Sequence, residues 1–91
     1  MKIDLEKIIK IYGEEYMELI DENIEDVKEN LLYMHEIGFT DIEDIFERYT
    51  PIFIRSNDEF KEKIRELVVK LGINYVEIIE NDLGLLEELK W

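Results

Sequence analysis

The side chain best suited to acid–base chemistry is that of His35, the only histidine in a chain of 91 residues that contains no cysteine. A catalytic histidine needs a positioned partner, such as a carboxylate or a nucleophile within hydrogen-bond reach. His35 instead follows Leu31 and Leu32 at the edge of an apolar stripe, a pattern typical of a partly buried structural histidine. We therefore expect His35 to be structural.

A group of carboxylates could bind calcium: Asp21, Glu22, Glu25, Asp26 and Glu29. An EF-hand calcium loop needs glycine at its sixth position and glutamate at its twelfth. Counted from Asp21, these positions hold Asp26 and Leu32, so the pattern favours a solvated acidic helix face over a metal site. We expect this face to bind a partner through Glu14, Glu18, Asp21, Glu22, Glu25, Asp26 and Glu29.

Other chemistry-bearing patterns are absent from the sequence. No glycine-rich phosphate loop, catalytic dyad or zinc-ligand spacing occurs in it. We therefore predict that the chain is not an enzyme and uses no metal or cofactor.

The charge of the chain indicates the kind of partner. The formal net charge is -13, and residues 14–47 contain thirteen acidic residues against Lys28 alone. A negative field repels phosphate and attracts basic surfaces. We expect a protein partner with a basic surface, because nucleic acid starts at an electrostatic disadvantage.

The length and hydropathy predict one soluble domain over residues 1–91. The mean hydropathy is -0.25, and no apolar run approaches the roughly 18 residues needed to span a membrane. The first residues alternate charged and apolar side chains where a signal peptide would have an apolar core. These features favour a cytoplasmic location without a membrane partner.

The elements that must position these residues are helices separated by one proline and four glycines. Apolar residues recur at helical spacing, and no long stretch alternates as a strand would. The sequence thus predicts an all-α array of short helix pairs without a sheet. The expected elements are helices over 4–12, 14–37, 41–49 and 57–71, a turn over 51–55, a helix opened by Asn74, and a short helix after Gly84. Asp21-Glu22-Asn23 can divide the second helix in two.

Polar residues before these helices predict their caps. Asp4 is the expected cap of the first helix, and Thr40 with Glu43 and Ser56 with Glu59 form two capping boxes; Asn74 with Glu77 repeats the pattern. Gly38 and Gly72 are expected to be left-handed caps. The predicted core consists of Ile9, Met17, Ile20, Val27, Leu31, Ile42, Ile45, Ile64, Leu67, Leu71, Val76 and Ile79. Tyr33 and Val69 fall opposite their stripes and indicate a second buried face or a binding patch.

Apolar residues recur at matching distances from Gly13, Gly38 and Gly72, which lie 25 and then 34 residues apart. This recurrence indicates an internal repeat. The alternative is that the same distances describe any amphipathic helix.

The segment EIGFTDIEDIFERYTPIFI, residues 36–54, resembles the repeat of mitochondrial transcription termination factor (mTERF) proteins. That repeat has a glycine end, a capped helix with paired aliphatics, an arginine–aromatic pair near a proline, and a turn leading to a longer helix. The resemblance covers roughly residues 31–86. The first unit lacks the proline, and the third has Leu85 in its place.

The resemblance implies a curved array of helical repeats that binds nucleic acid on a basic concave face. The alternative function is therefore a nucleic-acid-binding module with contacts at Lys61, Lys63, Arg65 and Lys70. A helical wheel places two of these residues on each flank of the apolar stripe, which favours lysine stems that cover the core edge. A related alternative is an acidic mimic of nucleic acid that occupies a DNA- or RNA-binding protein.

Overall fold

The computed structural model describes residues 5–89. Their elements are α1 (Leu5–Tyr12), α2 (Glu15–Glu22), α3 (Ile24–Glu36), α4 (Ile42–Arg48), α5 (Thr50–Phe53), α6 (Asn57–Leu71), α7 (Tyr75–Asn81) and a 3-10 turn, Leu83–Leu86. No strand occurs within these residues, and the predicted all-α class is confirmed. None of the described helices has both the length and the apolar character needed to cross a membrane.

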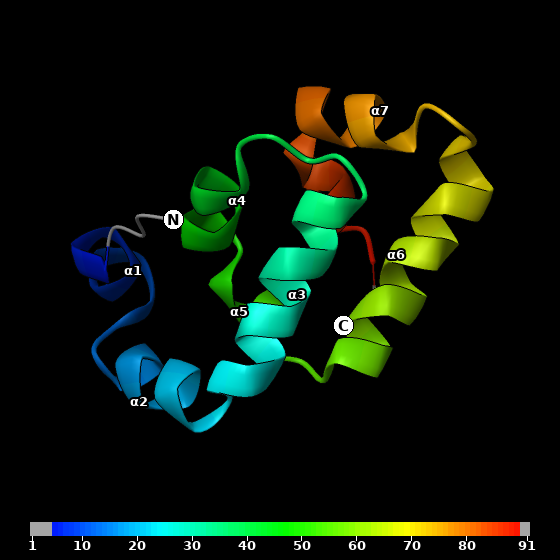
Figure 1. Ribbon diagram of the computed structural model, residues 1–91. Coiled ribbons are helices and arrows are strands. Elements are labelled where there is room, and N and C mark those ends of the chain that lie inside the picture. Colours follow the sequence, from blue (N-terminus) through cyan, green and yellow to red (C-terminus); the bar gives the residue numbers. More distant parts are fainter. Residues whose placement is uncertain (1–4, 90–91) are drawn as a thin grey trace.

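Helix α3 lies at the centre of the molecule (Figure 1). It packs against α6 on one side and against α4 and α5 on the other, while α1 contacts both α2 and α4. Helix α7 and the 3-10 turn close the end next to α6. The resulting body measures 37 × 24 × 24 Å.

Several local predictions are confirmed. The division of the second helix falls at Asn23, whose side-chain amide donates to the Leu19 carbonyl at 2.8 Å. Gly38 and Gly72 have φ values of +108° and +83°, a region that side chains other than glycine rarely adopt. The Ser56 hydroxyl accepts a hydrogen bond from the Glu59 backbone N–H at 3.3 Å. The repeat register itself stays a prediction.

Two predicted caps are wrong. Neither α4 nor α7 has a side-chain cap hydrogen bond, although Thr40 and Asn74 stand before them. The Thr40 hydroxyl instead donates to the Glu80 carboxylate at 2.7 Å, forty residues along the chain. A local sequence pattern could not reveal this competing partner. The expected cap Asp4 lies outside the described residues.

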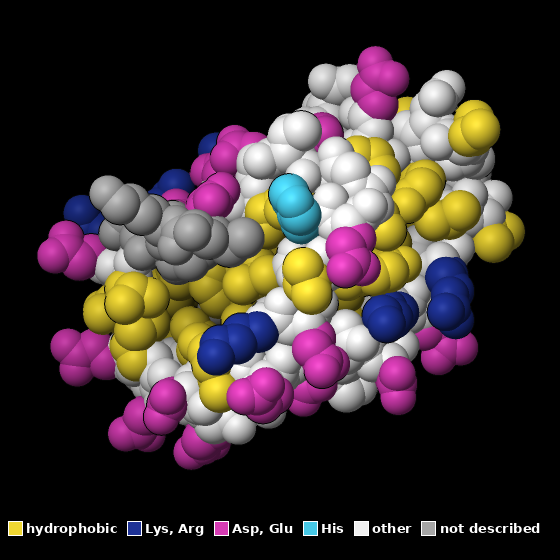
Figure 2. Space-filling view, in the orientation of Figure 1, with side chains coloured by type: hydrophobic (Ala, Val, Ile, Leu, Met, Phe, Trp, Pro, Cys, Tyr) yellow, Lys and Arg dark blue, Asp and Glu magenta, His cyan; other side chains and the backbone are white. Residues whose placement is uncertain are grey.

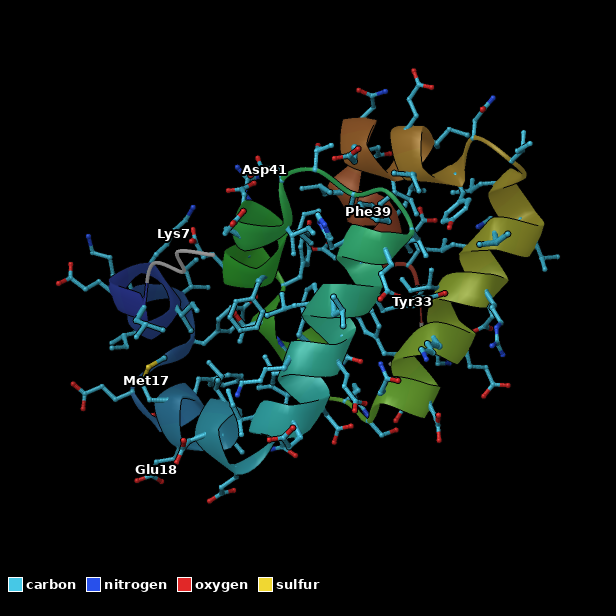
Figure 3. All side chains as sticks on the ribbon, viewed as in Figure 1. Lys7, Met17, Glu18, Tyr33, Phe39 and Asp41 are labelled. Atoms are coloured by element: carbon cyan, nitrogen blue, oxygen red, sulfur yellow. The ribbon has the colours of Figure 1, made fainter. Side chains whose placement is uncertain are left out.

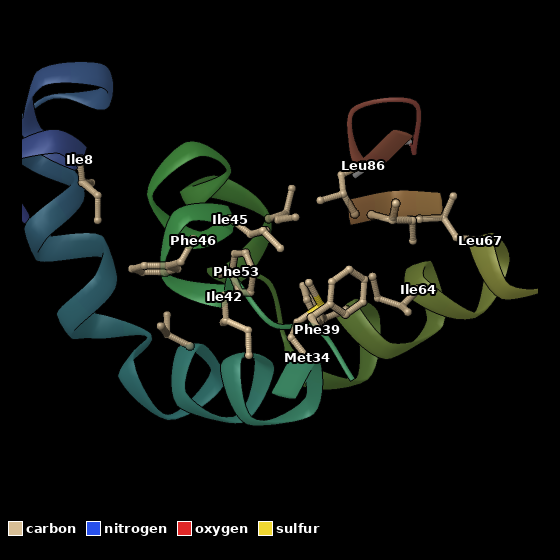
Figure 4. Packing of buried hydrophobic residues seen from close by; sticks show 14 residues of the cluster. Ile8, Met34, Phe39, Ile42, Ile45, Phe46, Phe53, Ile64, Leu67 and Leu86 are labelled. Carbon is tan, nitrogen blue, oxygen red and sulfur yellow. The ribbon is translucent and has the colours of Figure 1, made fainter. Parts of the chain in front are cut away.

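The core is one cluster of buried side chains that joins all parts of the fold (Figure 4). Of the residues predicted for it, six are buried: Val27, Ile42, Ile45, Ile64, Leu67 and Ile79. Five others are half-buried against the cluster: Met17, Ile20, Leu31, Leu71 and Val76. The prediction for Ile9 is wrong, because Ile8 is the fully buried residue of α1 and Ile9 lies at the surface of a hollow.

Aromatic side chains link the central helices. The rings of Phe46 and Phe53 meet edge to face at 5.3 Å between centroids, and those of Phe53 and Phe60 lie 5.2 Å apart. Tyr33 adds an edge contact to Phe60 at 6.2 Å. Each such contact contributes about 0.5–1.5 kcal/mol beyond area burial. The aromatic contacts thus help to fix the relative positions of α3, α4, α5 and α6.

Candidate functional site

The candidate site lies where α1 turns into α2. Gly13 ends α1 with a φ of +98°, and its backbone N–H donates to the Ile9 carbonyl at 2.8 Å. Helix α2 follows directly and buries none of its side chains fully. Tyr16, Met17 and Ile20 are half-buried against the core, and the other side chains of α2 are exposed and available for a partner.

A hollow of about 550 Å³ lies at this corner. Its apolar surface comes from Ile9 on α1 and Met17 on α2, and carboxylates of Glu14, Glu15 and Glu18 line the rest. Figure 3 shows Met17 where α1 and α2 meet, with Glu18 beside it on α2. The volume lies in the range of about 300–1,000 Å³ that is common for binding sites.

The three carboxylates of the hollow have no opposite charge paired with them in the part of the chain that the structure describes. Among residues 5–89, none of Glu14, Glu15 and Glu18 forms an ion pair, and no basic residue lines the hollow. The Glu15 carboxylate is folded back over the turn, since a Cβ on Gly13 would lie 2.9 Å from its oxygens. The hollow therefore combines an apolar surface with concentrated negative charge.

The other predicted acidic residues spread over α2 and the first half of α3. Asp21, Glu22, Glu25 and Glu29 are exposed. Asp26 is different, because its Oδ1 accepts a hydrogen bond from the Asn57 backbone N–H at 3.0 Å. A carboxylate at a helix N-terminus satisfies one of the free N–H groups there, so Asp26 stabilises the start of α6. The structure brings Glu14 and Glu18 together in the hollow and places the four exposed carboxylates along an acidic face, while Asp26 holds the start of α6.

The basic residues of α6 are mostly engaged with neighbours. Lys63 lies 3.5 Å from Glu66, and Lys70 lies 3.6 Å from Glu88. The Lys61 ammonium stands over the Tyr33 ring at 5.5 Å from its centroid. Arg65 is exposed and has no ion pair with any described residue. Within residues 5–89, three of these four basic side chains therefore already have a carboxylate or aromatic partner.

His35 is exposed, so the prediction of a partly buried histidine is wrong. Its side chain is visible on the face shown in Figure 2. No group of three or more metal-binding side chains occurs within residues 5–89. Of the two residues opposite the stripes, Tyr33 is half-buried against Phe60, whereas Val69 is 87% exposed.

Sequence reasoning missed the apolar half of the hollow. Ile9 and Met17 follow helical periodicity, which predicts core positions but cannot tell a core stripe from an apolar surface at a corner; Met17 is half-buried against the core and also lines the hollow. Glu15, which is adjacent to Glu14 in the acidic run, was a signal that the sequence did contain. No protein-family model, curated protein or solved structure matches the chain.

Proposed function

We propose that this chain is a non-catalytic module that binds a protein partner at the α1–α2 hollow. The partner presents a basic segment in which a lysine or arginine stands next to a large apolar side chain. The observation that carries the proposal is the joint lining of one hollow by Ile9, Met17 and three carboxylates without ion pairs among the described residues.

The two halves of the hollow have different roles. Burial of apolar surface against Ile9 and Met17 contributes affinity, at about 25 cal/mol per Å² removed from water. Each exposed ion pair to Glu14 or Glu18 adds only about 0.2–1 kcal/mol. The acidic face of α2 and α3 contributes mainly to the association rate and to the choice of partner, since its field attracts positive surfaces before contact.

The arrangement of basic residues gives less support to the nucleic-acid alternative. Phosphate binding requires several basic side chains that can release counterions on one surface. Lys63 and Lys70 are already paired with Glu66 and Glu88. An acidic protein that occupies a nucleic-acid-binding protein stays within the proposal, because such a target also presents a basic surface.

The proposal can be tested with a synthetic hexapeptide that contains three lysines, two leucines and a glycine. We expect it to shift the backbone amide signals of residues 9–18 saturably in a titration followed by ¹H–¹⁵N NMR. The double variant E14Q/E18Q should weaken binding at this hollow by roughly two- to fivefold or more, following the strength of exposed ion pairs. Both residues are exposed, so the fold should be unchanged.

The matched control is D58N/E62Q on α6, which removes the same charge from two exposed residues outside the hollow. It should leave the affinity at residues 9–18 nearly unchanged. If the two double variants weaken binding equally, the affinity depends only on net charge and the hollow is not a specific site. An absence of saturable shifts at residues 9–18 would also contradict the proposal.

A further inference from the structure

A second hollow of about 530 Å³, the corner hollow, lies along α7 at the corner that follows α6. Its walls come from the segment between α3 and α4, from the turn after Gly72, and from α7. The Glu80 carboxylate accepts hydrogen bonds from the Thr40 N–H at 3.2 Å and from the Thr40 hydroxyl at 2.7 Å. These two bonds fix one wall of the hollow against α7.

The apolar part of this corner hollow is unusually exposed. Ile73 is 94% exposed, more than any other large apolar residue described, whereas Val76, which also lines the hollow, is half-buried against the core. Figure 2 shows hydrophobic side chains gathered over the upper part of α6 and the corner leading to α7. Exposed apolar groups that lie together and are rimmed by polar residues are typical of interaction sites.

Two side-chain amides in the polar part of the corner hollow are available to hydrogen-bond a ligand. Asn74 stands at the N-cap position of α7 but makes no cap hydrogen bond, and the Asn81 side chain likewise has no hydrogen bond within residues 5–89. Each amide can both donate and accept, as the backbone of an extended peptide requires. Within residues 5–89, the Glu77 carboxylate forms no ion pair and no basic residue lines the hollow.

We propose that the corner hollow is a second site for basic protein segments, binding an extended stretch in which a lysine or arginine adjoins an aliphatic side chain. The cation meets Glu77, the aliphatic group covers Ile73 and Val76, and the peptide backbone meets Asn74 and Asn81. This inference rests on the proposed function, that the module binds basic segments. A partner long enough to reach both hollows gains affinity, because its second contact forms within the same complex.

The test uses the same hexapeptide and the full chain, with amide signals of residues 73–81 followed separately from those of residues 9–18. We expect saturable shifts at both places. I73S should weaken binding at residues 73–81 by about threefold or more, and E77Q by roughly two- to fivefold, while both leave the affinity at residues 9–18 unchanged. V69S is the matched control, because Val69 is 87% exposed but does not line the hollow.

The outcomes separate the two proposals. Shifts at residues 9–18 without saturable shifts at residues 73–81 overturn the inference and leave the proposed function standing. Shifts at residues 73–81 alone support the corner site and contradict the α1–α2 site, and no shifts at either place overturn both. A hexapeptide with glutamate in place of lysine should bind at neither hollow; if it binds equally well at the corner, the recognition of basic segments is wrong.

Discussion

The side-chain amide of Asn57 donates a hydrogen bond of 2.9 Å to the side-chain oxygen of Asn30, joining the start of α6 to the middle of α3. Asn30 is fully buried, and its own amide nitrogen donates to the carbonyls of Phe53 and Arg55, both at 2.9 Å. Every polar atom of the Asn30 side chain is therefore satisfied. This contact fixes the turn between α5 and α6 against α3.

We predict that N30A lowers the free energy of unfolding by about 2–4 kcal/mol, because buried carbonyls lose their donors and a cavity forms. N57A should cost about 1 kcal/mol, since Asn57 is only half-buried. Urea denaturation of both variants and of the double variant gives the coupling energy between the two residues. Additive losses, or a loss below about 0.5 kcal/mol for N30A, would contradict the structural role assigned to this contact.

Gly38 and Gly72 allow the cost of a positive φ to be measured without a steric clash from the added side chain. A Cβ at Gly38 or Gly72 would meet nothing within 4 Å, but both residues have positive φ. We expect G38A and G72A each to destabilise the fold by about 1 kcal/mol, measured by thermal or urea unfolding. Gly84 does not have a positive φ, so G84A is the control for backbone conformation, although its Cβ would lie 3.2 Å from a carboxylate oxygen of Asp82, which must shift slightly. Unchanged or increased stability of both G38A and G72A would remove the basis of the glycine-anchored repeat register.

Stability at high pH should report on three tyrosines. Burial raises the pKa of Tyr12, Tyr49 and Tyr75 above the ordinary value, with smaller contributions from neighbouring charges and tyrosines. Because the folded state favours the neutral phenol, this contribution is complete below about pH 10 and is lost as the pH rises through the higher folded pKa. The triple variant Y12F/Y49F/Y75F should therefore lose stability less steeply than the parent above about pH 10 in urea titrations. Parallel losses in the two proteins would contradict this assignment.

Nucleic-acid binding provides the sharpest test between the two classes of function. The net charge of -13 and the local pairing of Lys63 and Lys70 oppose phosphate contacts. We expect no saturable binding to mixed-sequence DNA or RNA in fluorescence anisotropy at about 0.15 M salt, up to about 100 µM protein. Saturable binding that is weakened by charge reversal at Lys61 and Arg65 would replace the protein-partner proposal with the nucleic-acid alternative.

The sequence by itself determined the features that depend on neighbouring residues. Helix α6 begins after its Ser56 cap and ends before Gly72, as predicted, because cap, apolar period and glycine all lie within one helix length. The break at Asn23 and the all-α class follow from the same local signals. The acidic face was also readable, since charge is a property of composition and position along the helix.

Only the tertiary structure determined which hydrogen-bond partners the polar residues take and which apolar residues are buried. The Thr40 hydroxyl hydrogen-bonds to Glu80 instead of capping α4. Ile8 is buried in the core in place of the predicted Ile9. Both outcomes depend on partners distant in sequence, which a local pattern does not identify. The same holds for the two hollows. Ile9 and Met17 line one hollow only because the chain turns between α1 and α2. Ile73 and Thr40 line the other only because α7 packs onto the segment before α4. Periodicity gave the faces of the helices, whereas packing decided which of these faces remain open to a partner.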